Sequence, residues 1–374
     1  MCLSHPTEGY YMKGDPIGAK GDFVTSPEIS QIFGELVGIW LVSQWLEYGN
    51  HRPIRLVELG PGRGTLMDDI LRTFNSIAQT KGRIQAVHLV ETSARLRDEQ
   101  RTKLSPRIRA ESLYWHDRIE DVKPSTDQFT MVIAHEFFDA IPIHIIEKTA
   151  QGFQEVLVDI DRTAQTLTTT SANVDSSNRH RSANFRYVLS GNMAPLARTL
   201  GQSSPRFATL PIGSRIEVSP ASWAIARTLG KLITENGGAG LIMDYGDDKA
   251  FGSSFRAFHR HKVVDVFHQP GMCDLTANVD FAYLREAISA GDTVGAACHG
   301  PITQQIFLTS MGAMIRLKKL LENIKDHERR ASLEKGAQRL VDPLGMGTQY
   351  KALGFSPAAA TPYPFRRVTH ESSR

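Results

Sequence analysis

The sequence has few cysteines, little net charge and no long apolar segment, and each absence excludes a class of protein. Three cysteines among 374 residues, none in a Cys-x-x-Cys pair, argue against a disulfide framework and suggest a reducing compartment. A formal net charge of +3 gives no reason to expect a nucleic-acid partner. Because no stretch reaches the roughly 18 apolar residues that cross a bilayer, we expect no stable membrane insertion.

Short apolar runs alternate with amphipathic stretches in the first part of the chain. Runs typical of buried strands occupy 54–60, 86–92 and 129–137, and a shorter one surrounds Tyr114 and Trp115. Helices are predicted between them at 65–80 and 93–104, and a later strand at 239–246 follows a helix that begins at Ser219-Pro220. This alternation predicts an α/β fold with a mostly parallel sheet and helices on both faces.

Other segments interrupt or extend this pattern. A helix is predicted from Ser26 to Gly49, a hairpin around Gln151-Gly152, a polar surface loop over 162–205 and an antiparallel pair of strands at 292–312. The predicted parts are an N-terminal lid or helical extension (1–50), a core (51–142 and 215–312), an inserted hairpin and polar loop (143–214), and a C-terminal helical extension and tail (313–374).

The stretch LVELGPGRGTLMDDIL (56–71) joins a predicted strand to a predicted helix through a loop with three glycines. Glu58, Gly60, Gly62 and Gly64 follow each other at intervals of two residues. Gly60 can adopt torsions that other residues avoid, Gly62 has no side chain to hold off a ligand, and Gly64 lets the helix pack closely. Since ligands of open parallel sheets bind at this edge, the loop predicts a ligand that approaches bare backbone.

Two ligand classes use such a loop. Dinucleotides prefer Gly-x-Gly-x-x-Gly, whereas Glu-x-Gly-x-Gly-x-Gly resembles the first motif of methyltransferases that use S-adenosylmethionine. Glu91, at the end of the second strand, could accept hydrogen bonds from both ribose hydroxyls of either ligand. An NAD-dependent oxidoreductase is the less favoured interpretation, because the glycine spacing differs and no second nucleotide-binding half follows. An ordinary strand–helix turn with a surface Glu is the alternative without a ligand.

Two acidic residues follow the strand at 129–137, in the sequence AHEFFDAIPIH (134–144). Carboxylates bind the planar guanidinium group of arginine as a fork, so Glu136 and Asp139 are candidate catalytic residues that could orient an acceptor. His135 lies beside them at the same predicted sheet edge. The alternative is that these charged residues only cap the strand.

Further polar residues are candidates for acceptor contacts or for a lid over the ligand. The lid candidates Asp22, Phe23, Thr25 and Glu28 lie in GDFVTSPEISQIFGE (21–35), which could equally be a clasp on the core. Two acceptor candidates, Asp244 and Tyr245, end the strand at 239–246.

No metal site is predicted. A zinc protease would need a second histidine four residues after His135, and that position holds Asp139. The alternating residues His259 and His261, with His268, are interpreted as surface residues of a loop.

Together these motifs resemble those of the MidA family. The motifs that carry the resemblance span about residues 9–350 in the family's order: GDFVTSPEISQIFGE, LVELGPGRGTLMDDILR, HLVETS, AHEFFDAIPIH, MDYG and PGMCDLTANVDF. The resemblance implies a class I, Rossmann-like methyltransferase fold with inserted antiparallel elements and helical additions. It also implies S-adenosylmethionine as cofactor, and arginine methylation of a core subunit of respiratory complex I during its assembly.

The resemblance also assigns residues by position. The cofactor loop corresponds to Glu58, Gly60, Gly62 and Gly64, the ribose acid to Glu91, and the motif after the fourth strand to Glu136 and Asp139. Asp117 is available as an acid near the adenine, although the spacing in HDRIEDV leaves that choice open.

A mitochondrial matrix location is implied, or the cytoplasm for a bacterial member. The transit peptide expected of a mitochondrial member is not among these residues. The implied partner is a protein substrate, and the oligomeric state stays open, a homodimer included. A non-catalytic assembly chaperone that binds S-adenosylmethionine is the alternative function.

Overall fold

A computed structural model describes residues 2–3, 8–10, 25–49, 51–161, 185–191, 194–290, 296–357 and 361–366. The chain divides into two units. The smaller one comprises Met1–Gly14, Pro142–Pro220 and Ala250–Ala277, and the larger one comprises Asp15–Ile141, Ala221–Lys249 and Asn278–Arg374.

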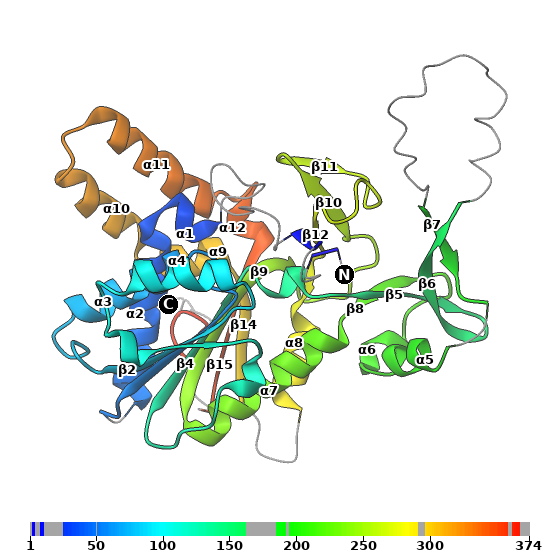
Figure 1. Cartoon of the computed structure of the whole chain (residues 1–374), viewed down its shortest axis with the longest axis horizontal. Coiled ribbons are helices and arrows are strands. Elements are labelled where there is room, and N and C mark those ends of the chain that lie inside the picture. The colour runs from blue at the N-terminus through cyan, green and yellow to red at the C-terminus, as the bar shows by residue number, and fades with distance from the viewer. Residues whose placement is uncertain are drawn as a thin grey trace, which may run out of the picture. The chain divides into compact units, whose positions relative to one another are not determined.

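An eight-stranded sheet forms the centre of the larger unit (Figure 1). Its strands are β1 (Ile54–Leu59), β2 (Ile84–Val90), β3 (Leu113–His116), β4 (Phe129–His135), β9 (Gly238–Asp247), β13 (Val279–Asp280), β14 (Ala297–Thr303) and β15 (Tyr350–Ser356). The order is β14-β15-β9-β4-β1-β2-β3, with β13 beside β9. Neighbouring strands from β3 to β9 run parallel, whereas β15 is antiparallel to both β9 and β14. The predicted α/β class with a mostly parallel sheet is confirmed.

Helices cover both faces of this sheet and bury one apolar core on each. The first core is formed with α2 (Gln31–Tyr48), α3 (Thr65–Ser76), α4 (Ala94–Leu104), α9 (Gln304–Ser310), α10 (Ala313–Glu322) and α11 (His327–Val341). The second is formed with α7 (Pro220–Asn236) and α8 (Phe281–Ser289). Because side chains alternate along a strand, Leu56 belongs to the first core and Val57 to the second. Glu58 therefore lies on the same face as α2 and α3.

Two short helices and three 3-10 turns complete the larger unit. They are α1 (Ser26–Ile29), α12 (Met346–Gln349), η2 (Ala110–Ser112), η3 (Ile119–Asp121) and η4 (Phe138–Ala140). The prediction of one helix from Ser26 to Gly49 was wrong, because Ser30 has extended backbone torsions that separate α1 from α2. The Ser30 hydroxyl accepts a hydrogen bond from the Ile32 backbone N–H at 3.3 Å, and so caps α2.

The predicted antiparallel pair within 292–312 was also wrong. β14 lies in this segment, but its partner is β15, about fifty residues further on, which the sequence analysis missed. Residues 304–310 form α9 instead, capped by the Thr303 hydroxyl, which accepts from the Ile306 N–H at 3.2 Å. The C-terminal helical extension predicted from residue 313 begins with two helices, because α10 ends at Glu322 and Asp326 caps a new helix, α11. The same segment also contains α12 and the sheet strand β15.

The smaller unit contains two antiparallel sheets. The four-stranded sheet has the order β7-β6-β5-β8 and the three-stranded sheet the order β11-β10-β12. Their strands are β5 (His144–Thr149), β6 (Gly152–Ile160), β7 (Phe185–Leu189), β8 (Arg215–Val218), β10 (Arg256–His259), β11 (Lys262–Val264) and β12 (Asp274–Thr276), and two helices are α5 (Pro195–Gly201) and α6 (Pro205–Ala208). The hairpin predicted around Gln151-Gly152 is confirmed.

Part of the polar loop predicted over 162–205 is regular structure. Strand β7 and helix α5 were not predicted there, because their short apolar runs are embedded in polar sequence. Residues 162–184 and 192–193 lie outside the described residues. No helix in the described ranges is both long enough and apolar enough to cross a bilayer.

Candidate active site

The glycine loop after β1 has backbone torsions that would be strained for a residue with a side chain. Gly60, Gly62 and Gly64 have φ angles of 63°, 52° and 76°, all in the left-handed region. A Cβ atom on Gly60 would lie 2.9 Å from Cδ2 of Phe137, and one on Gly64 would lie 3.4 Å from Cγ of Gln100. The loop therefore needs glycine for its conformation and, at Gly60, also for space.

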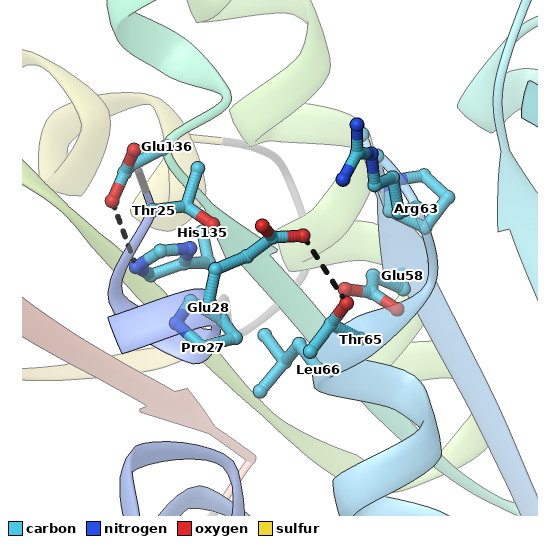
Figure 2. A pocket seen from close by; sticks show the side chains of 12 residues that line it. Thr25, Pro27, Glu28, Glu58, Arg63, Thr65, Leu66, His135 and Glu136 are labelled. Atoms are coloured by element: carbon cyan, nitrogen blue, oxygen red, sulfur yellow. Dashed lines mark hydrogen bonds and ion pairs between the residues drawn. The ribbon is translucent and has the colours of Figure 1, made fainter. Parts of the chain in front are cut away.

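This loop, α1 and the end of β4 line a pocket of about 70 Å³ (Figure 2). Helix α1 contributes Pro27 and Glu28, and Figure 2 shows Glu28 and Thr65 pointing toward one another across the pocket. The Glu28 carboxylate accepts a hydrogen bond from the Thr65 hydroxyl at 3.4 Å, and Lys103 donates to the same hydroxyl at 2.7 Å. Helix α1 thus lies directly over the start of α3.

Glu58 presents a buried acid to this pocket. Its residue exposure is 2%, and burial raises the pKa of its carboxyl to about 8. Within the described part of the chain, its Oε2 atom has no hydrogen-bond partner. A buried acid with an unused oxygen, next to bare glycine backbone, fits a ligand that carries a positive charge and polar groups.

Glu91 follows β2 and lies one strand away from the loop. Its carboxylate accepts hydrogen bonds from the Ser93 N–H at 2.8 Å and from Gln100 at 3.5 Å, and burial raises its pKa. Gln100 also donates to the Gly62 carbonyl at 2.7 Å and accepts from the Trp115 indole at 2.8 Å. Gln100 therefore ties the glycine loop, Glu91 and β3 together. The sequence does not indicate Gln100 as a site residue, since a lone glutamine in a helix belongs to no motif.

Asp117 lies at the surface near Glu91. Its side chain is 73% exposed and forms an ion pair with Arg97 at 2.5 Å. The Arg97 Nε atom also donates to the Glu91 carbonyl at 2.7 Å, so this pair braces the chain after β2.

Glu136 directly follows β4 and has an unusual backbone conformation. Its φ angle is 47°, rare for a residue with a side chain, and such strain tends to occur at functional sites. Its Oε1 atom lies 3.3 Å from Nε2 of His135 and accepts a hydrogen bond from the Ser26 N–H at 3.4 Å. Burial, reinforced by Asp139, raises the pKa of Glu136 to about 8, whereas burial lowers that of His135 to about 3. The imidazole is therefore neutral, and both side chains line the pocket.

Asp244 supports the turn that follows Glu136. Its Oδ2 atom accepts hydrogen bonds from the N–H groups of Phe137, Phe138 and Asp139 at 3.2, 3.0 and 3.3 Å. The side chain is fully buried, and burial, reinforced by Asp139 and Glu136, raises its pKa although the N–H groups of Asp139 and Tyr245 oppose the rise. The structure thus places Asp244 beneath the turn and not in the lining of the pocket.

Two tyrosines contact the candidate catalytic acids. The Tyr245 hydroxyl donates to Oδ2 of Asp139, and the Tyr350 hydroxyl hydrogen-bonds the carboxyl of Glu136. Tyr350 was missed together with the whole of β15. Of the lid candidates, Thr25 and Glu28 line the pocket, whereas Asp22 and Phe23 lie outside the described residues.

Known families, curated proteins and solved structures include relatives of this chain. Residues 36–302 match the family described as "Putative S-adenosyl-L-methionine-dependent methyltransferase". Similar proteins include protein arginine methyltransferase NDUFAF7, mitochondrial, of Xenopus laevis, which is 39% identical over 95% of this chain and 79% of the relative. The human protein of the same name is 37% identical over 95% of this chain and 78% of its own length.

Two solved structures from Burkholderia thailandensis share the fold. One is a COG1565 superfamily member bound to S-adenosyl-homocysteine, with a TM-score of 0.75 and 24% identity over 98% of this chain and 88% of that one. The other, also of the COG1565 superfamily, has a TM-score of 0.71 and 25% identity over 96% of this chain and 86% of that one.

The sheet order and the family match define a methyltransferase of the class I fold, and its cofactor is S-adenosylmethionine. The predicted fold, cofactor and enzyme class are thereby confirmed. The chain belongs to the NDUFAF7/MidA family of protein arginine methyltransferases, as its motifs predicted.

Proposed function

We propose that this protein methylates arginine on a core subunit of respiratory complex I during its assembly, in the mitochondrial matrix or, for a bacterial member, in the cytoplasm. The names of its relatives support arginine as the acceptor and mitochondria as the compartment. The assignment of a complex I subunit as the substrate rests on the resemblance of the sequence motifs to those of the family. The acceptor is therefore a protein whose target side chain is a cation.

The cofactor would be held by the glycine loop, Glu58 and Glu91. S-adenosylmethionine supplies a methyl group on a positively charged sulfonium sulfur, which is already activated for attack by a nitrogen nucleophile. The loop offers bare backbone, Glu58 offers an unused buried oxygen, and Glu91 offers a carboxylate that can accept from two hydroxyl groups. What the protein must supply is alignment of the nucleophile and exclusion of water.

The observation that carries the acceptor assignment is the strained, buried Glu136 with Asp139 three residues later. Two carboxylates at this position could hold a guanidinium group as a fork and direct one nitrogen toward the pocket. A methylated nitrogen must then lose a proton. Because burial raises the pKa of Glu136 to about 8, its carboxylate is a base of suitable strength to accept that proton near neutral pH.

The test is transfer of a radiolabelled methyl group to complex I core subunits by the wild type, Glu136→Gln and Asp139→Asn. Both variants should keep cofactor affinity in calorimetric titrations and lose at least about a hundredfold in kcat. Asp98→Asn changes an acid of α4 that is 74% exposed, and it should behave as the wild type. Label recovered on a residue other than arginine would refute the acceptor assignment.

A chaperone role makes a different prediction in cells. If the protein assists complex I assembly without catalysis, both acid variants should rescue assembly in a strain that lacks the protein. If catalysis is required, neither variant should rescue assembly. Mass spectrometry of complex I subunits from these cells should then show the target arginine without the added mass of methyl groups.

A further inference from the structure

Tyr245 and Tyr350 form a pair beneath the two candidate catalytic acids. They are direct partners in the antiparallel register of β9 and β15, and their rings lie 5.5 Å apart at 74°. Side chains of such partners stand on the same face of a sheet. The Tyr245 hydroxyl donates to Asp139, and the Tyr350 hydroxyl hydrogen-bonds Glu136. Each phenol thus contacts a different acid.

We propose that Tyr245 and Tyr350 are positioning residues that hold the carboxyls of Asp139 and Glu136 toward a cationic acceptor and favour their ionised forms when that acceptor binds. This inference rests on the proposed function, since it assigns roles around the same acceptor. Tyr350 becomes a site residue that no sequence motif indicated, and the Tyr245 hydroxyl becomes the donor that positions Asp139. Neither phenol needs to touch the cofactor.

Hydroxyl donors are needed next to Glu136 and Asp139 because several acids lie close together here. Asp139 raises the pKa of Glu136, and Asp139 and Glu136 both raise that of the buried Asp244, so these neighbouring acids add to the cost of ionising a buried carboxyl. A hydroxyl that donates to a carboxylate stabilises its charged form. Burial raises the pKa of both tyrosines well above the ordinary value, so both stay protonated and remain donors.

Among the described residues, few other groups can stabilise an ionised Glu136. The charged and titratable groups that surround its carboxyl there are the preceding His135, Asp139 in the following turn, Asp244 on β9, Tyr350 on β15 and Arg339 on α11. The Ser26 N–H of α1 also donates to it. His135 is neutral because burial lowers its pKa to about 3, and Arg339 acts through space as the smallest of these influences. Tyr350 is therefore the principal side-chain donor to Glu136.

The register of β9 and β15 explains why these two tyrosines meet the acids. On β15 the next residue, Lys351, is paired with Asp244, and its Nζ donates to the Gly246 carbonyl at 3.1 Å. A shift of one residue would move Tyr350 to the other face and bring Lys351 toward the acids. The pairing thus places uncharged donors where a lysine would compete with a cationic substrate.

The experiment compares the wild type with Tyr350→Phe and Tyr245→Phe, which keep the rings and remove only the hydroxyls. The pH dependence of kcat/KM for arginine methylation should have its acidic limb moved upward by about one pH unit in each variant. At pH 7 this corresponds to a loss of about tenfold, and the loss should shrink at higher pH. Tyr48→Phe is the matched control, because Tyr48 also donates to a glutamate, Glu47 at 2.8 Å, but at an exposed site.

A second measurement does not depend on activity. Carbon NMR of protein labelled at the glutamate carboxyls, with Glu136 assigned by its loss in Glu136→Gln, should show Glu136 titrating at higher pH in Tyr350→Phe. A loss of activity that is equal at every pH, with an unchanged Glu136 titration, would overturn the positioning role. Absence of arginine methylation by the wild type would overturn the proposed function instead, while the NMR titration still decides whether Tyr350 controls Glu136.

Discussion

Replacing Glu58 with glutamine should flatten the pH dependence of the protein's stability. Glu58 is 2% exposed on β1, and burial raises its pKa from 4.5 to about 8. The unfolded chain exposes this carboxyl and releases its proton near pH 4.5, whereas the folded protein holds the proton up to about pH 8. The stability contributed by the neutral carboxyl is therefore fully present below pH 4.5 and is lost as the pH rises through about 8.

The magnitude follows from linkage between protonation and folding. Each pH unit across this interval changes the free energy of unfolding by about 1.4 kcal/mol per proton. Between about pH 6 and about pH 9, Glu58 alone should lower the wild-type free energy of unfolding by about 3 kcal/mol. Glutamine has nearly the same shape but no proton to lose, so Glu58→Gln should lack this component.

The assay is urea unfolding of both proteins at several pH values. Other buried acids, such as Asp69 and Glu136, also have a raised pKa, but they contribute equally to both proteins. The difference between wild type and variant therefore isolates Glu58. Asp98→Asn, at an exposed position on α4, should keep the wild-type slope. Parallel curves for the wild type and Glu58→Gln would refute the claim that Glu58 is buried in its neutral form.

Three further predictions concern the same edge of the sheet. Gly60→Ala should cost about 1–2 kcal/mol and abolish cofactor binding in calorimetric titrations, because a Cβ would meet Phe137 at 2.9 Å. Gly82→Ala, at a φ of 73° in open space, should cost a similar amount yet bind normally. Asp244→Ala should lower stability to urea by about 3 kcal/mol by removing the acceptor of four backbone N–H groups, whereas Asp248→Ala, at the partly exposed ion pair with Arg285, should cost less than about 1 kcal/mol. Cofactor binding near neutral pH should release protons, detected as a titration enthalpy that differs between phosphate and Tris buffers; equal enthalpies would contradict neutral buried acids in the free protein.

The parts of the fold that the sequence predicted correctly are those with local signals. The strand at 54–59, the glycine loop and the helix at 65–76 form one continuous pattern of apolar run, glycines and amphipathic stretch. Glu58 and Glu136 could be placed at the same edge of the sheet, because the carboxyl ends of parallel strands lie at one edge.

The parts that were missed depend on contacts between distant segments. β15 completes the sheet only because it pairs with β9 and β14, and its sequence YKALGFS has too little alternation to mark a strand. Tyr350 could not be placed without this pairing. Gln100 was missed for a related reason, since its three partners come from separate elements. The local spacing of residues carries no information about contacts between segments that are distant in the sequence.

The concentration of buried acids at this edge has a common physical explanation. Glu58 faces the glycine loop and Glu136 the adjoining turn, and burial raises the pKa of both to about 8. Burial makes an ionised carboxylate costly, and a bound cation removes much of that cost. The methyl donor carries a sulfonium charge and arginine a guanidinium charge, so each ligand can replace a proton on a nearby acid. The free protein is then most stable when these acids are neutral. On the roles proposed for Glu58 and Glu136, the same desolvation that lowers stability above neutral pH would favour cationic ligands at this site.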